Sequence, residues 1–238
     1  MNWPVPEVET ALAIFPEPTI VLCDLDGTLV DSVPDLAYSI DEMQAALGLE
    51  RRGEERVRQW VGNGAERLVH RALTAEMDAD ADGRLFQQAF PLFLDFYARH
   101  TSDRSELYAG VGAGLEQLAA LNIRLACITN KPRRFAEPLL KELGILDFFE
   151  AVVGGDCLPQ KKPSPEPLLH AITLLDGEPA HTLYVGDSET DVRAARAAGI
   201  TVVCVTYGYN HGRDIRAAKP DAVIDSLTQL PELFAQAG

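Results

Sequence analysis

Residues 19–31 read TIVLCDLDGTLVD, and this stretch decides the fold. An apolar run, residues 19–23, ends on two acids and a glycine, which is typical of a buried β-strand followed by a loop. A short strand that is apolar at every position suits the interior of a parallel sheet with helices on both faces. The rest of the chain is therefore expected to supply further strands of this kind.

Such strands follow in the second half of the chain, where apolar runs alternate with helical patterns. We expect strands at 124–129, 151–155, 182–187, 201–206 and 221–225, and helices near 112–121, 133–143, 165–175 and 189–198. This alternation predicts an α/β protein with a parallel sheet. Ligands of such sheets bind at the carboxyl ends of the strands, so we expect the chemistry just after Cys23, Ile128, Val153 and Val185.

A segment near 32–101 contains no convincing strand and interrupts this core. Leu36, Ile40, Met43 and Leu47 recur at helical spacing, and a second helical pattern follows Gly64. A third pattern covers residues 85–100, where a proline at position 91 predicts a break or a late start. We therefore expect an all-helical insert, preceded by an irregular arm, residues 1–18, that carries four prolines and has no assigned role.

Composition narrows the classes of partner and location. The 238 residues include 36 acidic and 21 basic side chains, a formal charge of −15, and such a field repels nucleic acid and anionic membranes. No apolar run has the length of a membrane span, and no basic leader is visible, so we expect a cytoplasmic monomer or homodimer. The four cysteines show no metal-type spacing and are expected to be reduced thiols.

Two carboxylates, Asp24 and Asp26, leave the first strand on the same side, because alternate residues of a strand share a face. One can act as nucleophile or metal ligand and the other as general acid and base. Gly27 permits a tight turn, and the backbone N–H groups beyond it, including that of Thr28, can hold phosphate oxygens. The alternative interpretation is an acidic turn without chemistry.

Phosphate donors follow at two later positions. Thr129 and Asn130 place a hydroxyl and an amide at a strand end, where they can bind phosphate or simply cap a helix. Lys162 stands in KKPSP, residues 161–165, whose prolines stiffen the backbone, so its ammonium can be aimed at a phosphoryl group. The alternative for this segment is a solvated basic turn.

Asp187 and Asp191 complete the set at the fourth strand end. They lie one helical turn apart and, with Asp24, can supply the hard oxygen ligands that Mg²⁺ prefers. The alternative is that these acids only stabilise the amino end of the following helix. Since all four segments follow expected strands in one order, we predict a phosphoryl-transfer site that acts on a small-molecule phosphate ester.

The motifs DLDGTLVDS (24–32), ITNK (128–131), KKPSP (161–165) and VGDSETD (185–191) resemble, in this order, those of the haloacid dehalogenase-like phosphohydrolases. The resemblance implies a Rossmann-like catalytic core, residues 1–31 and 102–238, with a helical cap domain, residues 32–101, inserted after the first motif. Segments 53–73, 152–169 and 206–210 are similar to the bacterial phosphoglycolate phosphatase subgroup.

The same resemblance implies roles for the reacting groups. Asp24 attacks phosphorus and forms an aspartyl-phosphate, and Asp26 protonates the departing alkoxide and later activates water. Thr129 and Lys162 hold phosphate oxygens, with Asn130 as a helper.

It also implies a metal site. Mg²⁺ is expected on Asp24, the backbone carbonyl of Asp26 and Asp187. Asp191 either supports the metal or orients Lys162.

The expected substrate is 2-phosphoglycolate, hydrolysed to glycolate and phosphate. Gly62, Asn63 and Gly64 precede a helix, and their backbone and amide donors can bind a small carboxylate there. Arg67 is either a further contact to substrate or a solvated charge.

Three other functions are alternatives to this one. A dehalogenase is disfavoured by Asp26, because a departing halide needs no proton. A sugar phosphomutase has the same core motifs, so only the cap separates it from a phosphatase. A non-catalytic binding protein is disfavoured by the intact carboxylates, Thr129 and Lys162.

Overall fold

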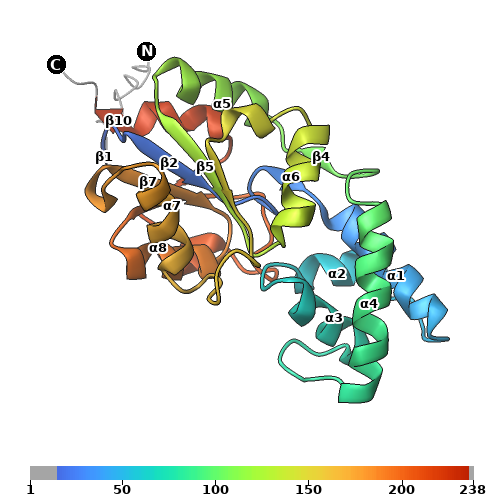
Figure 1. Ribbon diagram of the computed structural model, residues 1–238. Helices are drawn as coiled ribbons and strands as arrows, with labels where there is room; N and C mark the ends of the chain where they lie inside the picture. The colour runs from blue at the N-terminus through green and yellow to red at the C-terminus, as the bar shows by residue number, and fades with distance from the viewer. Residues whose placement is uncertain (1–14, 236–238) are drawn as a thin grey trace, which may run out of the picture.

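A six-stranded parallel sheet forms the centre of the computed structural model, which describes residues 15–235 (Figure 1). The strand order is β6-β5-β2-β7-β8-β9. The bounds are β2 (Ile20–Cys23), β5 (Arg124–Ile128), β6 (Ala151–Val153), β7 (Thr182–Gly186), β8 (Thr201–Val205) and β9 (Ala222–Ile224). In the register of the sheet, Cys23 lies opposite Cys127 on one side and Val185 on the other, so three strands that carry motifs end side by side.

Helices cover both faces of this sheet, and the expected α/β class is confirmed. Val21 and Cys23 pack against α5 (Val111–Ala120), α6 (Arg133–Glu142) and the 3-10 helix η4 (Leu227–Leu233). Ile20 and Leu22 face α7 (Glu166–Leu174), α8 (Glu189–Ala198) and η3 (Ile215–Ala218). Successive residues of β2 thus point to opposite cores, which is why the strand is apolar at every position. Two further 3-10 helices are η1 (Leu146–Phe148) and η2 (Pro179–His181).

A group of four helices lies beside the sheet, and the arrowheads of β2 and β5 point toward it (Figure 1). The group consists of α1 (Val33–Ala46), α2 (Glu54–Trp60), α3 (Ala65–Thr74) and α4 (Gly83–Arg99). The helical spacing of Leu36, Ile40 and Met43 places all three in a separate apolar core of this group. We call α1–α4 the helical group. No helix within residues 15–235 is long and apolar enough to cross a membrane.

One expectation for the helical group was wrong, and one of its helices was not predicted from the sequence. Pro91 lies inside α4 and does not end it, although proline lacks the N–H that would bond to the carbonyl of Gln87. The helix continues because Ala89, Phe93 and Tyr97, at four-residue spacing, all lie in the buried core. Helix α2 was not expected, since only two of its seven residues are buried and its apolar pattern is too sparse.

The chain enters and leaves the helical group through adjacent short strands. β3 (Val30–Asp31) pairs antiparallel with β4 (Glu106–Leu107). Beside this pair, the buried carboxylate of Asp35 accepts hydrogen bonds from the backbone N–H of Arg104 (3.0 Å) and from the N–H and hydroxyl of Ser105 (2.8 and 2.6 Å). Asp35 therefore ties the exit of the helical group to its first helix.

The expected irregular arm lies mostly outside the described residues. Its last part contains β1 (Phe15–Pro16), which pairs in parallel with β10 (Phe234–Ala235) near the other end of the chain.

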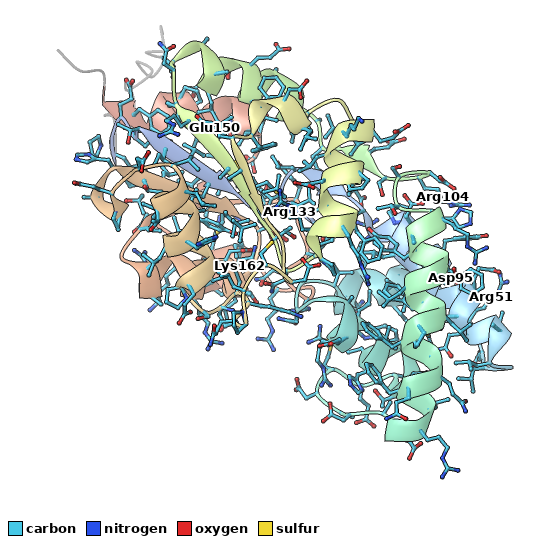
Figure 2. The ribbon with its side chains drawn as sticks, viewed as in Figure 1. Arg51, Asp95, Arg104, Arg133, Glu150 and Lys162 are labelled. Atoms are coloured by element: carbon cyan, nitrogen blue, oxygen red, sulfur yellow. The ribbon has the colours of Figure 1, made fainter. Side chains whose placement is uncertain are left out.

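Replacing Asp35 should destabilise the protein strongly. In Asp35→Ala the buried donors of Arg104 and Ser105 lose their acceptor, and we expect about 3 kcal/mol less free energy of unfolding in urea. The matched control is Asp95→Ala, which breaks an exposed ion pair with Arg99 on the outer side of α4 (Figure 2). A loss below about 0.5 kcal/mol is expected there. Equal losses in the two variants would contradict the role given to Asp35.

Candidate active site

The carboxyl ends of the strands and the helical group line a cleft between them. One wall comes from loops of the sheet and the other from the helical group. The sheet side contributes Asp24, Asp26, Thr129, Asn130, Lys131, Pro132, Phe135 and Lys162, and the helical group contributes Leu36, Val61, Gly62, Gly64, Ala65, Leu68, Phe93 and Tyr97. Figure 2 labels Lys162 at the end of the sheet nearest to this cleft.

The ammonium of Lys162 occupies the centre of the buried charges. Its Nζ lies 2.7 Å from Asp24 Oδ1 and 2.8 Å from Asp191 Oδ1, and it is 2.8 Å from the hydroxyl of Tyr184. Burial alone would lower the pKa of Lys162, but Asp191 and Asp24 outweigh burial and raise it. Burial raises the pKa of Asp24 to about 7, although Lys162 opposes the shift. Lys162 therefore stays charged and supplies positive charge next to Asp24 and Asp191.

Asp191 is saturated by protein donors. Its Oδ1 accepts from Lys162 and from the Tyr184 hydroxyl (2.9 Å), and its Oδ2 accepts from the Ser188 hydroxyl (2.6 Å) and from the backbone N–H groups of Ser188 and Asp187. Burial would raise the pKa of Asp191, but Lys162 and these hydrogen bonds lower it. Asp191 is thus a fixed anion that holds Lys162 in place.

Asp187 is held more loosely. Each of its oxygens accepts one hydrogen bond, from the Thr28 hydroxyl (2.9 Å) and from the backbone N–H of Tyr209 (2.6 Å). Burial, with Asp191 and Asp24 nearby, raises its pKa well above the ordinary value. The turn at Gly27 is pressed against this side chain: its φ is +92°, and a Cβ there would lie 2.4 Å from Asp187 Oδ2.

These acids fit a divalent cation. Asp24, Asp187 and Asp191 each offer a carboxylate oxygen, and the three oxygens lie within 4.8 Å of one another. One ammonium, Lys162, leaves two of the three buried negative charges uncompensated, and hard oxygen ligands suit Mg²⁺. Because the oxygens of Asp191 are already engaged, Asp24 and Asp187 are the better placed ligands.

The expected phosphate donors differ in position from the sequence interpretation. The backbone N–H of Gly27 donates to Val30 O (2.9 Å) and that of Thr28 to Leu25 O (3.3 Å), so both are used within the turn. The N–H groups of Leu25 and Asp26, which the sequence interpretation missed, have no acceptor among residues 15–235. The signal in the sequence that could have identified them as phosphate donors is their position directly after Asp24.

Asn130 also differs from expectation. Its side-chain amide donates to Lys162 O and accepts from Lys162 N, each at 3.0 Å, so it clamps the backbone of the lysine loop. Gly155, just after β6, packs against the backbone of Asn130, where a Cβ would lie 2.2 Å from the carbonyl oxygen of Asn130. Thr129 accepts a hydrogen bond from the N–H of Lys131 (3.1 Å), and its buried hydroxyl lines the cleft.

A second ion pair, between Lys131 and Asp26, was missed from the sequence. Lys131 Nζ lies 2.6 Å from Asp26 Oδ1, and the same oxygen accepts from the Ser32 hydroxyl at 2.5 Å. Both Lys131 and Asp26 line the cleft. A lysine two residues beyond Thr129 in a strongly acidic chain was the signal available for this pair.

In the helical group, Gly62 and Gly64 line the cleft as expected, but two other candidates do not. The amide of Asn63 donates to the Thr190 hydroxyl (3.3 Å), across the rim of the cleft. Arg67, for which the sequence left contact with substrate and a solvated charge both open, pairs with Asp80 (2.7 Å) and does not line the cleft.

Three more contacts hold the helical group against the sheet. Asp31 accepts a two-armed ion pair from Arg58 (3.1 and 3.0 Å) and a hydrogen bond from the Tyr209 hydroxyl. His211 Nδ1 lies 2.8 Å from Gln59 O, and a third contact joins Asn130 to Gly62 O. These contacts hold the helical group next to the cleft.

Comparison with known proteins gives a consistent result. The family model described as haloacid dehalogenase-like hydrolase matches residues 18–199. A phosphoglycolate phosphatase of Nitrosococcus oceani is 53% identical over 221 residues, which cover 93% of this chain and 98% of that protein. A phosphoglycolate phosphatase of Thiobacillus denitrificans is 45% identical over 224 residues, covering 94% and 99%.

Among solved structures, a predicted phosphoglycolate phosphatase from Haemophilus somnus is similar with a TM-score of 0.84 and 36% identity. The match covers 90% of this chain and 97% of that one.

Removing the central ammonium should destabilise the metal-free protein. Lys162→Met leaves Asp24 and Asp191 buried without their cation, and we expect a loss of about 3–5 kcal/mol in the free energy of unfolding, measured in urea with EDTA. Lys161→Met is the matched control. The Lys161 ammonium is partly exposed, and its ion pair with Glu66 is long, at 4.0 Å. That change should cost less than about 0.5 kcal/mol. Unchanged stability of Lys162→Met would refute the central role of this charge.

Proposed function

The chain belongs to the haloacid dehalogenase-like hydrolases and is a phosphoric monoester hydrolase, and we propose that it is Mg²⁺-dependent and acts on 2-phosphoglycolate. The observation that carries the proposal is Lys162, buried between Asp24 and Asp191 in the cleft. A carboxylate, a fixed cation and a cluster of further acids are the parts that phosphoryl transfer needs, since its catalysis is mainly positioning and neutralisation of charge.

In the proposed first step, a carboxylate oxygen of Asp24 forms a bond to phosphorus and the ester P–O bond breaks. Lys162 binds one Asp24 oxygen, which leaves the other for the attack. The Lys162 ammonium, the Thr129 hydroxyl and the N–H groups of Leu25 and Asp26 hold the phosphoryl oxygens. The product of this step is an aspartyl-phosphate on Asp24.

Asp26 serves as the acid and then the base. In its protonated form it delivers its proton to the departing alkoxide, and the resulting carboxylate takes a proton from the water that attacks phosphorus. That attack breaks the bond between Asp24 and phosphorus and releases phosphate. Ser32 and Lys131 both contact Asp26 Oδ1, which fixes the orientation of the carboxyl group.

The metal site proposed here consists of Asp24, Asp187 and the backbone carbonyl of Asp26. Bound Mg²⁺ supplies positive charge that lets an anionic carboxylate approach an anionic phosphate. Asp191, expected as a possible ligand, is assigned to Lys162 instead because its oxygens accept five hydrogen bonds from protein donors.

The helical segment 32–101 is proposed as a cap that excludes water and limits substrate size. Leu36, Val61, Leu68, Phe93 and Phe135 make much of the cleft wall apolar. Such a wall offers few hydrogen-bond partners for the several hydroxyls of a sugar, so a small substrate is favoured over the sugar phosphate of a mutase. Several relatives of similar length are named phosphoglycolate phosphatase, which supports the same choice.

Loss of the nucleophile should abolish turnover without unfolding the protein. Asp24→Asn keeps the shape of the side chain but not its nucleophilicity, and kcat for 2-phosphoglycolate with Mg²⁺ should fall by more than about 10³-fold. Asp95→Asn, an exposed change on α4, should retain full activity. The idea fails if Asp24→Asn keeps more than about a hundredth of wild-type kcat while its urea transition is native-like.

A substrate panel tests the metal and the substrate together. The value of kcat/KM for 2-phosphoglycolate should exceed those for β-glucose 1-phosphate, a nucleoside monophosphate and pyrophosphate. Activity should disappear in EDTA and return with added Mg²⁺, because the acid cluster then regains its counter-charge. A higher kcat/KM for any of the other three would reject 2-phosphoglycolate, and isomerised glucose phosphate would indicate a mutase.

A further inference from the structure

The hydroxyl of Tyr97 is buried beside the cleft and makes no hydrogen bond of standard geometry to the described residues. Tyr97 is 2% exposed and lines the cleft, and its hydroxyl has no hydrogen-bond partner within residues 15–235. The ring is fixed between Phe93, whose centroid is 5.7 Å away, and Phe135, at 5.1 Å. A buried hydroxyl that has lost water without gaining a partner is unfavourable, whereas phenylalanine would fill the same space without this cost. The position therefore points to a partner that enters with the ligand.

Burial raises the pKa of Tyr97 to about 12. The phenol therefore remains protonated at neutral pH and can donate a hydrogen bond. A natural acceptor for a donor in this place is an anionic oxygen.

Lys131 supplies a cation next to the Tyr97 ring, and its charge lowers the pKa of the Tyr97 hydroxyl against the larger effect of burial. Its Nζ lies 5.1 Å from the centroid of the Tyr97 ring and makes one side-chain ion pair, with Asp26 Oδ1. An ammonium has three N–H donors, so Lys131 can bind a second anion while it stays close to Asp26. Among the described residues, Lys131 and Lys162 are the only basic side chains that line the cleft, and Lys162 is already engaged with Asp24 and Asp191.

The length of the substrate selects this corner of the cleft. In 2-phosphoglycolate one methylene separates the ester oxygen from the carboxylate carbon. Asp26 must reach the ester oxygen to protonate it, so a group that is 2.6 Å from Asp26 lies within reach of the carboxylate. The amino end of α3, where the sequence analysis expected the carboxylate to bind, offers amides at Gly62 and Gly64. The ammonium nearest to it, that of Lys161, lies 4.0 Å from Glu66 and does not line the cleft.

We propose that the Tyr97 hydroxyl and the Lys131 ammonium bind the carboxylate of the substrate and determine specificity for a small phosphorylated acid. This inference rests on the proposed function. One carboxylate oxygen accepts from Tyr97 and the other from Lys131, in charge-assisted hydrogen bonds. Lys131 would thus contact both the carboxylate of the substrate and the proposed acid, Asp26.

The test compares two substrates that differ only in the carboxylate. Ethyl phosphate replaces the carboxylate of 2-phosphoglycolate by a methyl group and keeps the ester oxygen and methylene. In Tyr97→Phe, kcat/KM for 2-phosphoglycolate should fall about tenfold or more, as expected for the loss of a hydrogen bond to a charged group. For ethyl phosphate it should stay within about twofold, because the hydroxyl makes no contact that this substrate needs. The variant should fold normally, because within residues 15–235 the hydroxyl makes no hydrogen bond of standard geometry.

Tyr108→Phe is the matched control. Its hydroxyl is also buried without a partner among the described residues, but Tyr108 does not line the cleft. This variant should leave kcat/KM unchanged for both substrates.

Lys131→Met tests the Lys131 ammonium, the second proposed ligand of the carboxylate, independently of Tyr97. It should slow both substrates, because Asp26 loses a partner, but its effect on 2-phosphoglycolate should be at least about tenfold larger. Lys131→Arg, which keeps the charge, should restore part of the preference for 2-phosphoglycolate.

The outcomes separate this inference from the proposed function. If wild type prefers 2-phosphoglycolate to ethyl phosphate but Tyr97→Phe and Lys131→Met leave that preference unchanged, the carboxylate site is wrong and the proposed substrate stands. A wild-type enzyme with no preference for 2-phosphoglycolate would overturn both. Loss of the preference in these two variants, and not in Tyr108→Phe, supports the site.

Discussion

The buried ion pairs between Lys162 and the carboxylates of Asp24 and Asp191 are the interaction on which the site depends. The three side chains come from different strand ends, and an ammonium removed from water is tolerable only where anions surround it. The surrounding backbone is arranged to hold that contact. Asn130 clamps the lysine loop, and Ser188 and Tyr184 hold Asp191. The order of the strands, with β2 between β5 and β7, makes the convergence possible.

The cleft contains a second ion pair, between Lys131 and Asp26, that is separate from those of Lys162. Lys131 compensates Asp26, while Lys162 compensates only part of the cluster formed by Asp24, Asp187 and Asp191. The raised pKa values of Asp24 and Asp187 reflect that unbalanced charge, because burial and neighbouring anions both disfavour ionisation. An anionic substrate and a divalent cation suit such a cleft when they bind together, because the opposite charge of each lowers the free-energy cost of burying the other.

Much of the core was predictable because parallel strands have a simple pattern. Four apolar runs ended in polar motifs, and the carboxyl ends of parallel strands meet at one edge, so the convergence of Asp24, Thr129 and Asp187 followed from order alone. The helical group was less predictable. Helix α2 buries too few residues to give a period, and α4 continues through Pro91 because its packing outweighs one missing hydrogen bond.

By itself, the sequence determined the class of fold, the family and the side chains available for phosphoryl transfer, because these depend on local pattern and chain order. Only the tertiary structure decided which partners those side chains have. It assigned Asn130 to the backbone of Lys162, turned Asn63 and Arg67 away from the cleft, and brought Tyr97 beside Lys131. The physical reason is that hydrogen bonds and ion pairs depend on distances of a few ångströms between residues far apart in the chain, and only packing sets those distances.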